Sequence, residues 1–387
     1  MLCNLHVVMN DCLHASRVLK ETQSISKLLP RDGQVVVVAA NRSGRAPSHE
    51  RLDDHRSIER IGVNIPRFLR GKAATAVRFP LWMLLVLKRY LPLRPKMVNI
   101  HHAETLVLGA LFKFLAGSKF VYDPHELEAE KNGYGALKKR LVAFLENFII
   151  PYADEVFVVN RSISEEYARR YSCSPPHVLM NVPWFTEPPK RSRQLHDALG
   201  LSADKKICLY LGALTKGRGI EFIMDAFEAA DSSEYVAVFV GYGPLQGAIE
   251  ERARKCPCIY FHPAVQPTEV LDIAASADVG LCLIESVSLS YHYCLPNKFF
   301  EYLFAGIPVV VTPLPELTRL VDEYGVGVVL QEHTPQALQL AVREAGAVGA
   351  AGIEKNIEKV RLDYSWDAQE VVVRKVYGKY FGMSEAL

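Results

Sequence analysis

The fold is decided by the stretch LPNKFFEYLFAGIPVVV, which occupies residues 295–311. A loop ends at Pro296, apolar residues then recur at helical spacing, and Gly306 stops the helix. The run Ile307–Val311 that follows is apolar throughout, which is typical of a strand buried on both faces. A helix that leads into such a strand indicates a parallel sheet covered by helices.

The same alternation of short apolar runs and helical segments extends along the whole chain. It predicts an α/β protein with two Rossmann-like, doubly wound parallel sheets. Strands are expected near 4–9, 34–39, 97–101, 119–123, 155–159, 207–211, 235–240, 258–261, 278–283, 307–311 and 326–330. Helices are expected near 15–28, 79–90, 104–116, 136–150, 162–171, 219–230, 244–254, 268–276, 297–304, 315–323 and 335–345.

The chain is long enough, at 387 residues, for two domains. A Pro-rich, charged stretch after residue 183 is typical of an interdomain linker. We expect an N-terminal domain over 1–183, a linker over 184–203, a C-terminal domain over 204–365 and a helix over 366–387 that crosses back to the first domain. Ligands of such sheets bind outside the carboxyl ends of the strands, so two facing sheets would line a cleft.

Composition is that of an ordinary globular protein, with 49% hydrophobic and 23% charged residues. The start of the chain does not have the pattern of a secretory signal, and no apolar run is long enough to span a bilayer. We therefore expect a cytoplasmic protein, either soluble or peripheral on the inner face of the membrane. The eight Cys are expected to be reduced, and Cys256-Pro257-Cys258 lacks a second pair at zinc-site spacing.

A basic segment covers residues 64–96. No Asp or Glu occurs from Ile61 to Ala103, while Lys and Arg alternate with Phe, Leu and Trp82. Such a segment suits an anionic surface, either phospholipid headgroups or a lipid-linked phosphate. Two ordinary helices with solvated Lys and Arg explain it equally well. Nucleic acid is not expected as a partner, because the net charge of the chain is only +2.

The stretch 295–311 also carries a candidate anion site. The amino end of a helix that begins at Asn297 offers unpaired N–H groups. Lys298 adds a cation there, which is unfavourable to the helix dipole unless an anion compensates. Glu301, one turn further, could accept bidentate hydrogen bonds from a ribose diol. Alternatively, Lys298 and Glu301 simply pair on a surface helix.

Two glycine-rich turns follow strands that are expected at the same sheet edge. The turn Gly212–Gly219 contains Arg218, and Gly241 and Gly243 end the next strand. Small residues let the backbone approach a phosphate, and Arg218 could neutralise it. Each turn alone is weak evidence, but together with the helix at Asn297 they predict a phosphate site.

In the first half, His125 lies where a strand ends. It could hydrogen-bond a sugar hydroxyl or steady a positive charge, although a loop histidine without function is the ordinary expectation. Asp11 and Arg17 follow the first strand and are placed to contact an acceptor.

Several motifs of other enzyme classes are absent from the sequence. There is no G-x-G-x-x-G after the first strand, no Walker lysine loop, no G-x-S-x-G and no H-E-x-x-H. These absences argue against dinucleotide oxidoreductases, P-loop NTPases, α/β-hydrolases and zinc proteases. No D-x-D pair stands at a strand end, which argues against a metal-dependent single-domain transferase.

Taken together, these residues resemble the donor-site motif of the family-four retaining glycosyltransferases, which have the GT-B fold of two Rossmann-like domains facing a cleft. The most specific part is Pro296-Asn297-Lys298-x-x-Glu301-Tyr302-x-x-x-Gly306-x-Pro308. The segments Tyr122–Glu126, Gly212–Gly219, Gly241–Pro244 and Ala277–Val279 match other parts of the family's pattern in the same order.

The resemblance implies roles for individual residues. Glu301 would bind the ribose hydroxyls, Arg218 and Lys298 would hold the diphosphate, and His125 would face the donor sugar and the reaction centre. The donor site would be completed by Asn297, Gly212, Gly219, Gly241, Gly243 and Val265. Two positions depart from the family: Tyr293 stands where a first Glu is usual, and Ala213 where an Arg is usual. We interpret the chain as a Pro-Asn-Lys variant of the family.

The implied reaction is metal-independent, retaining transfer of a hexosyl or N-acetylhexosaminyl group from a nucleotide-diphosphate sugar, UDP before GDP. The acceptor would be a glycan or lipid-linked glycan of cell-surface polysaccharide or lipopolysaccharide biosynthesis, and neither a cofactor nor a metal is expected. Two alternatives stay open. A sugar-nucleotide epimerase on the same fold would need an acid/base pair, for which only His125 is a candidate. A non-catalytic partner subunit is compatible with Tyr293 and Ala213.

Overall fold

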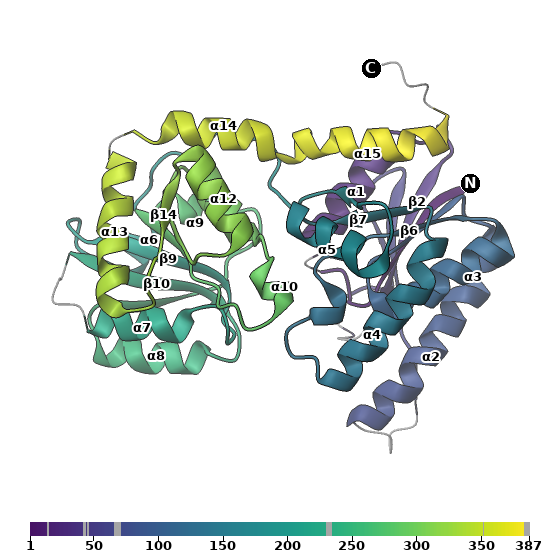
Figure 1. Cartoon of the computed structure of the whole chain (residues 1–387), viewed down its shortest axis with the longest axis horizontal. Helices are drawn as coiled ribbons and strands as arrows, with labels where there is room; N and C mark the ends of the chain where they lie inside the picture. The colour runs from purple at the N-terminus through teal and green to yellow at the C-terminus, as the bar shows by residue number, and fades with distance from the viewer. Residues whose placement is uncertain are drawn as a thin grey trace. The chain divides into compact units, whose positions relative to one another are not determined.

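The computed structural model describes residues 1–13, 15–41, 44, 46–65, 71–229, 234–350 and 352–382. The chain divides into two compact units, which are Met1–Asn181 with Gln369–Leu387, and Val182–Ala368 (Figure 1). The expected linker over 184–203 thus belongs to the second unit. Part of it forms helix α6 (Gln194–Leu199), which buries Leu195 completely.

The first unit is built on one sheet with the strand order β3-β4-β2-β1-β5-β6-β7-β8. Its strands are β1 (Leu2–Val8), β2 (Gln34–Ala40), β3 (His49–Arg51), β4 (Arg56–Ile61), β5 (Met97–Ile100), β6 (Lys119–Tyr122), β7 (Glu155–Val158) and β8 (His177–Val178). All neighbouring strands are parallel except β3, which is antiparallel to β4. The order reverses direction between β1 and β5, as in a doubly wound fold.

Helices cover this sheet. They are α1 (Ser16–Ser26), α2 (Gly71–Tyr90), α3 (Leu106–Ala116), α4 (Ala136–Ile149), α5 (Arg161–Tyr171) and α15 (Trp366–Phe381), with the short 3₁₀ segments η1 (Leu91–Leu93), η2 (Ala103–Thr105), η3 (Glu128–Glu130) and η4 (Ile150–Tyr152). The last helix, α15, packs on the first unit, where Tyr377 donates a hydrogen bond to Glu21 and Glu370 accepts one from Ser24.

The second unit has a fully parallel sheet with the order β11-β10-β9-β12-β13-β14. Its strands are β9 (Lys206–Ala213), β10 (Tyr235–Tyr242), β11 (Ile259–Pro263), β12 (Val279–Cys282), β13 (Val309–Val311) and β14 (Gly327–Val329). Its other helices are α7 (Ile220–Glu228), α8 (Gln246–Lys255), α9 (Val270–Ala274), α10 (Leu289–His292), α11 (Asn297–Phe304), α12 (Pro315–Tyr324), α13 (Pro335–Ala350) and α14 (Glu354–Tyr364). The predicted pair of parallel-sheet α/β halves is confirmed.

The structure departs from the expected elements where the sequence is polar or contains proline. Strands β3 and β4 were not predicted, because they are rich in charged residues and have no apolar run; β3 is the edge strand, and β4 lies between it and β2. Helix α2 begins at Gly71 rather than near residue 79, and Pro80 lies inside it. Pro80 had suggested a helix start, because proline is favoured in a first turn.

Two further findings concern the cysteines and membrane helices. Cys256 and Cys258 are joined by a disulfide, which corrects the expectation that all the cysteines are reduced. The other six are free, and Cys3, Cys12, Cys208 and Cys282 are buried. Among the described residues, the structure contains no helix with the length and apolar character needed to cross a membrane.

Candidate functional site

The carboxyl ends of β9 and β10 approach each other closely in the second unit. Gly241 pairs with Gly212, and a Cβ on Gly241 would lie 1.9 Å from the Gly212 carbonyl oxygen. A Cβ on Gly243 would lie 2.5 Å from the carbonyl oxygen of Leu214. These glycines are therefore required by backbone packing at the strand ends. Their contact with a phosphate stays a prediction.

Gly219 holds the start of α7 against the end of β12. Its φ is +74°, and a Cβ there would lie 2.1 Å from the carbonyl oxygen of Leu283. Only glycine can adopt this positive φ and leave room for the Leu283 carbonyl oxygen without a shift of the backbone. The turn that carries Arg218 is thereby fixed next to the loop that follows β12.

Lys298 lies in the first turn of α11 and points its ammonium group at the strand ends. Its side chain is only 7% exposed, and its Nζ has no hydrogen-bond partner among the described residues. Nζ lies 3.4 Å from the centroid of the Tyr210 ring and 3.9 Å from the place where a Cβ on Gly212 would be. Burial, together with the nearby charge of Arg218, lowers the pKa of Lys298 to about 7.

Arg218 is the second cation of this region. Its guanidinium carbon lies 4.8 Å from the centroid of the Tyr291 ring, and its Nε is buried without a hydrogen-bond partner among the described residues. Tyr291 belongs to α10, and the loop before it packs on Gly217, whose Cβ would lie 3.2 Å from Val287. The turn after β9 and the loop after β12 thus position Arg218 together.

The charge of Arg218 disfavours the charged form of Lys298, and the amino end of α11 adds a partial positive charge. Burying an uncompensated charge costs several kcal/mol, roughly speaking, so such an arrangement needs a reason. An anion bound between Lys298 and Arg218 would supply the missing partner.

The other predicted donor-site residues lie around this point. Glu301 is half-buried one turn after Lys298, and its carboxylate favours the charged form of Lys298. Asn297 is exposed at the first position of α11. Val265 is half-buried in the loop after β11, and Gly212 is exposed at the end of β9. The structure brings Lys298, Arg218, Glu301 and Gly212 together, and the place of Val265 in the donor site stays a prediction.

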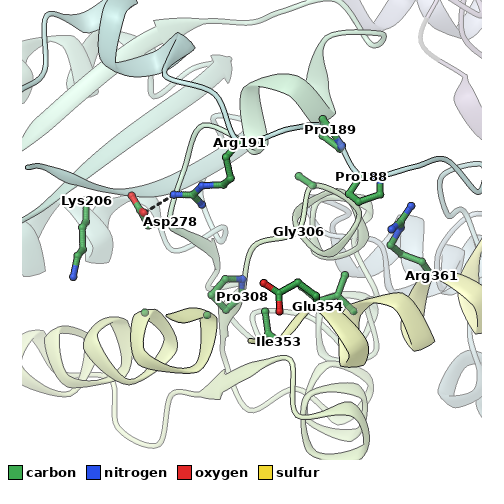
Figure 2. A pocket seen from close by; sticks show the side chains of 14 residues that line it. Pro188, Pro189, Arg191, Lys206, Asp278, Gly306, Pro308, Ile353, Glu354 and Arg361 are labelled. Atoms are coloured by element: carbon green, nitrogen blue, oxygen red, sulfur yellow. Dashed lines mark hydrogen bonds and ion pairs between the residues drawn. The ribbon is translucent and has the colours of Figure 1, made fainter. Parts of the chain in front are cut away.

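A different cavity, of about 480 Å³, lies at the opposite edge of the same sheet (Figure 2). Lys206, the first residue of β9, and Asp278, directly before β12, line it. Arg191 donates a hydrogen bond to Asp278 across 2.7 Å. The cavity therefore lies at the amino ends of the strands, away from Lys298 and Arg218, and does not contain the predicted donor site.

His125, in the first unit, belongs to a chain of polar side chains at the ends of β1, β5 and β6. His101 lies at its centre: its Nε2 is 2.8 Å from His6 Nδ1, and its Nδ1 is 3.1 Å from both His125 Nε2 and Asp123 Oδ2. Burial lowers the pKa of His125 to about 4 despite the attraction of Asp123. His125 is therefore a neutral imidazole at pH 7, and its side chain stays 31% exposed.

Arg17 is engaged inside the first unit, and its predicted contact with an acceptor stays a prediction. It is buried, and it donates hydrogen bonds to both carboxylate oxygens of Asp123 and to the Leu179 carbonyl oxygen. Burial alone would raise the pKa of Asp123, but Arg17 and the histidines hold it well below its usual range. Arg17 thus keeps Asp123 ionised. Asp11 is half-buried, and its carbonyl oxygen accepts a hydrogen bond from Arg60.

The sequence-based prediction missed the buried part of this network. Asn4 donates to Asn99, and Asn99 and Tyr377 both donate to Glu21. Burial raises the pKa of Glu21 well above its usual range. Polar residues inside otherwise apolar strands were the available signal, because a buried polar side chain needs a partner.

Three groups of side chains in the first unit have the composition of metal ligands. The groups are His6, Glu21 and His101; His101, Asp123 and His125; and His102, Glu104 and Glu128. In the first two, the histidines hydrogen-bond one another, Asp123 accepts from Arg17, and Glu21 accepts from Asn99 and Tyr377. In the third, Lys131 pairs with Glu128 at 3.3 Å and Lys138 with Glu104 at 3.0 Å. Since these side chains already have hydrogen-bond or ion-pair partners, we assign a metal to none of the three groups.

The basic segment 64–96 is only partly described, since 66–70 lie outside the described residues. Within α2, Trp82 is buried, so its ring is not available to a membrane. Leu81, Leu84 and Leu85 are exposed instead. Arg89 pairs with Glu59, and Lys88 is exposed.

Comparison with known proteins gives a consistent result for both units. Residues 19–184 match the family described as "Glycosyl transferase 4-like domain", and residues 205–346 match "Glycosyl transferases group 1". A teichuronic acid biosynthesis glycosyltransferase of Bacillus subtilis, TuaC, is 25% identical over 193 residues. That match covers 49% of this chain and 46% of TuaC, so it spans about half the length of each.

Solved structures share the fold over nearly the whole chain. Sucrose-phosphate synthase from Thermosynechococcus elongatus has a TM-score of 0.77 at 17% identity, covering 99% of this chain and 100% of that chain. Alr3699/HepE of Anabaena, in complex with UDP-glucose, has a TM-score of 0.72 at 13% identity, covering 97% of this chain and 99% of that chain. WaaG, a glycosyltransferase involved in lipopolysaccharide biosynthesis, has a TM-score of 0.67 at 14% identity, covering 98% of this chain and 100% of that chain.

These likenesses establish the fold, and the two family matches fall on the two units separately. Residues 19–184 are therefore similar to the glycosyltransferase 4-like domain and residues 205–346 to glycosyltransferases group 1, and the chain has the GT-B fold of two parallel-sheet α/β halves.

Proposed function

We propose that the chain transfers a sugar from a nucleoside-diphosphate sugar to a glycan acceptor, and that the second unit binds the donor. One observation carries this proposal. The ammonium group of Lys298 is buried, has no hydrogen-bond partner among the described residues and lies beside Gly212 at the strand ends. With Arg218 and the amino end of α11, it forms a cationic site that a pyrophosphate would neutralise.

The proposed reaction follows from this charge distribution. When the bond between the anomeric carbon and the β-phosphate oxygen breaks, negative charge develops on the departing diphosphate. Lys298, Arg218 and the amino end of α11 would stabilise that charge, which is electrostatic catalysis by preorganised groups. The acceptor oxygen would bond to the anomeric carbon on the same face, with retention, and its proton would pass to the departing phosphate oxygen.

We assign Glu301 to the ribose hydroxyls and His125 to the donor sugar. Glu301 lies one turn after Lys298, so a nucleoside held by its carboxylate would leave its phosphates near the ammonium group. A neutral His125 can both donate and accept a hydrogen bond, which suits a sugar hydroxyl. No metal or other cofactor is part of this proposal.

The donor base and the acceptor are inferred from the similar proteins. Structures of HepE with UDP and with UDP-glucose support a UDP-sugar before a GDP-sugar. TuaC and WaaG are named for teichuronic acid and lipopolysaccharide biosynthesis, which supports a cell-surface glycan or its lipid-linked precursor as acceptor. We place the protein at the cytoplasmic face of the membrane, with the described part of 64–96 toward the anionic surface.

The proposal is tested by thermal unfolding with UDP, GDP and ADP, followed by hexose and N-acetylhexosamine derivatives of the best nucleotide. We expect UDP and a UDP-sugar to raise the melting temperature, since a ligand that binds only the folded state stabilises it. The stabilising UDP-sugar is then incubated without acceptor. Slow hydrolysis supports a transferase, whereas conversion to an epimer would identify an epimerase. Calorimetry that detects no binding of any nucleoside diphosphate would show a non-catalytic protein.

A further inference from the structure

Helix α4 exposes an apolar stripe along its whole length. Leu137, Leu141, Phe144 and Phe148 are spaced at one face of a helix, and their exposed fractions are 83%, 55%, 58% and 57%. Most large apolar side chains of the protein are buried, so the exposure of four of them on one face of α4 sets this face apart. Large apolar side chains that gather exposed on one face mark a contact with a partner or a membrane.

Two neighbouring helices continue this surface. Helix α3 packs against both α4 and α2 (Figure 1). It exposes Val107, Phe114 and Leu115, and α2 exposes Val77, Leu81, Leu84 and Leu85. The Phe114 ring lies 5.4 Å from the ring of Tyr152 in η4, directly after α4. We call these exposed side chains of α2, α3, α4 and η4 the three-helix face.

The charges on the three helices are of one sign. Neither α2 nor α3 contains Asp or Glu, and Glu146, the one acidic residue of α4, is buried and accepts hydrogen bonds from Tyr122, Tyr167 and Tyr171. Arg78, Lys88 and Arg140 are exposed and form no ion pair with other described residues. Lys138 and Lys139 pair with Glu104 and Glu130 at the border of the face.

We propose that the three-helix face docks on a lipid bilayer that contains anionic headgroups. Its apolar side chains would enter the interface between headgroups and acyl chains, while Arg78, Lys88 and Arg140 would contact the phosphates. Charge complementarity selects this occupant. A second copy of the chain would bring the same positive face against itself, because a two-fold interface pairs like surfaces. The stripes on α3 and α4 are independent of the basic segment that the sequence singled out.

The experiment measures flotation of the full chain with vesicles of phosphatidylcholine, alone or mixed with phosphatidylglycerol. The test variant combines Leu137→Gln, Phe144→Gln and Phe148→Gln, which keep a good helix former on α4. A matched control combines Leu340→Gln, Leu362→Gln and Val371→Gln, three residues that are exposed to 57%, 57% and 65% on other helices.

We expect the wild type and the control to bind the mixed vesicles, and the α4 variant to bind at least about tenfold more weakly, because the buried apolar area sets much of the binding strength. Equal binding of the two variants, or no binding of the wild type to mixed vesicles, overturns the proposal. So does a wild-type dimer in sedimentation velocity that the α4 variant dissociates, since a second copy would then cover the face.

Circular dichroism and UDP binding of each variant complete the experiment. Retained UDP binding with lost vesicle binding shows that the variant is folded and that the defect is confined to the face. Another outcome is that the wild type itself fails to bind UDP while only the α4 variant loses vesicle binding. In that case the proposed donor site is wrong and the docking surface stands. The two proposals therefore fail separately.

Discussion

Lys298 is a residue whose position favours function over stability. Its ammonium group is buried beside Tyr210 with no hydrogen-bond partner among the described residues, and its pKa falls to about 7. A lysine in such surroundings weakens the folded state unless something anionic binds, and groups of this kind concentrate at functional sites. Two predictions follow from this one residue.

Replacing the lysine by an uncharged side chain of similar length should stabilise the free protein. Because Lys298 has a folded-state pKa of about 7 and an unfolded-state value near 10.5, the unfolded chain holds the extra proton between these pH values. The cost of burying the charge is therefore full below pH 7 and disappears toward pH 10.5. Lys298→Met should raise the free energy of unfolding by about 1–4 kcal/mol at pH 6, and by less at pH 9, in urea titrations. A loss of stability at pH 6 would contradict this account.

Binding of a nucleoside diphosphate should drive proton uptake by Lys298. At pH 8 most Lys298 side chains of the free protein are uncharged amines, and a bound diphosphate would favour the charged ammonium form. Calorimetry of UDP binding at pH 8, in buffers of different ionisation enthalpy, should show uptake of up to about one proton. Lys298→Arg is the control, because an arginine guanidinium is already charged at pH 8 and should take up no proton when UDP binds. An uptake that is the same in both proteins would show that Lys298 is not at the phosphates.

Among the elements, the parallel strands and their helices could be predicted from the sequence, because their apolar runs are buried on both faces. Helix α11 with strand β13 is one example. Strands β3 and β4 could not, since their charged side chains give no period, and neither could the inclusion of Pro80 within α2. Polar edges and helix starts are fixed by tertiary contacts, which override local preference.

The candidate site was predictable to a similar extent. The glycines and cations of the second unit follow strands, and parallel strands bring their carboxyl ends to one edge. Arg17 shows the limit of that reasoning. It follows β1 along the chain, but its side chain turns inward to Asp123, a residue more than a hundred positions away. Pairing over such a distance leaves no local signal.

The junction of α7 with β12 depends on Gly219. Gly219→Ala should lower the free energy of unfolding by about 2–4 kcal/mol, because the new methyl group meets the Leu283 carbonyl oxygen at a positive φ. Gly247→Ala in α8 is the matched control, since its Cβ has nothing within 4 Å and alanine favours a helix. The control should be neutral or slightly stabilising in the same urea titration. Similar effects of the two substitutions would refute the role given to Gly219.

At the scale of the whole molecule, the chain returns to its first unit through α15. Tyr377 is fully buried there, its hydroxyl donates to Glu21 across 2.7 Å and its ring stacks on Phe157 at 5.7 Å between centroids. The first unit thus needs the last helix to satisfy a carboxyl in its own core. This connection explains why the first unit includes residues from both ends of the chain.

Removing that hydroxyl should destabilise the first unit. Tyr377→Phe removes one hydrogen bond to the buried Glu21 and one from the buried Asn99, which should cost about 1–3 kcal/mol of unfolding free energy. Tyr152→Phe, which removes a hydroxyl from a side chain that is 49% exposed, should change it by less than about 0.5 kcal/mol. The comparison is made by urea unfolding at pH 7. An unchanged stability of Tyr377→Phe would show that α15 is not held by this contact.

The central claim is that Lys298 and Arg218 bind the diphosphate of a nucleotide at the strand ends of the second unit. Isothermal titration calorimetry of UDP at pH 7 tests it with Lys298→Met, Arg218→Met and the control Lys206→Met, which lies at the other end of β9. We predict that each of the first two substitutions weakens UDP binding by at least about tenfold, as expected for the loss of a charge-assisted contact, and that the control leaves it unchanged. Unchanged affinity in Lys298→Met and Arg218→Met, or an equal loss in all three, would contradict the claim.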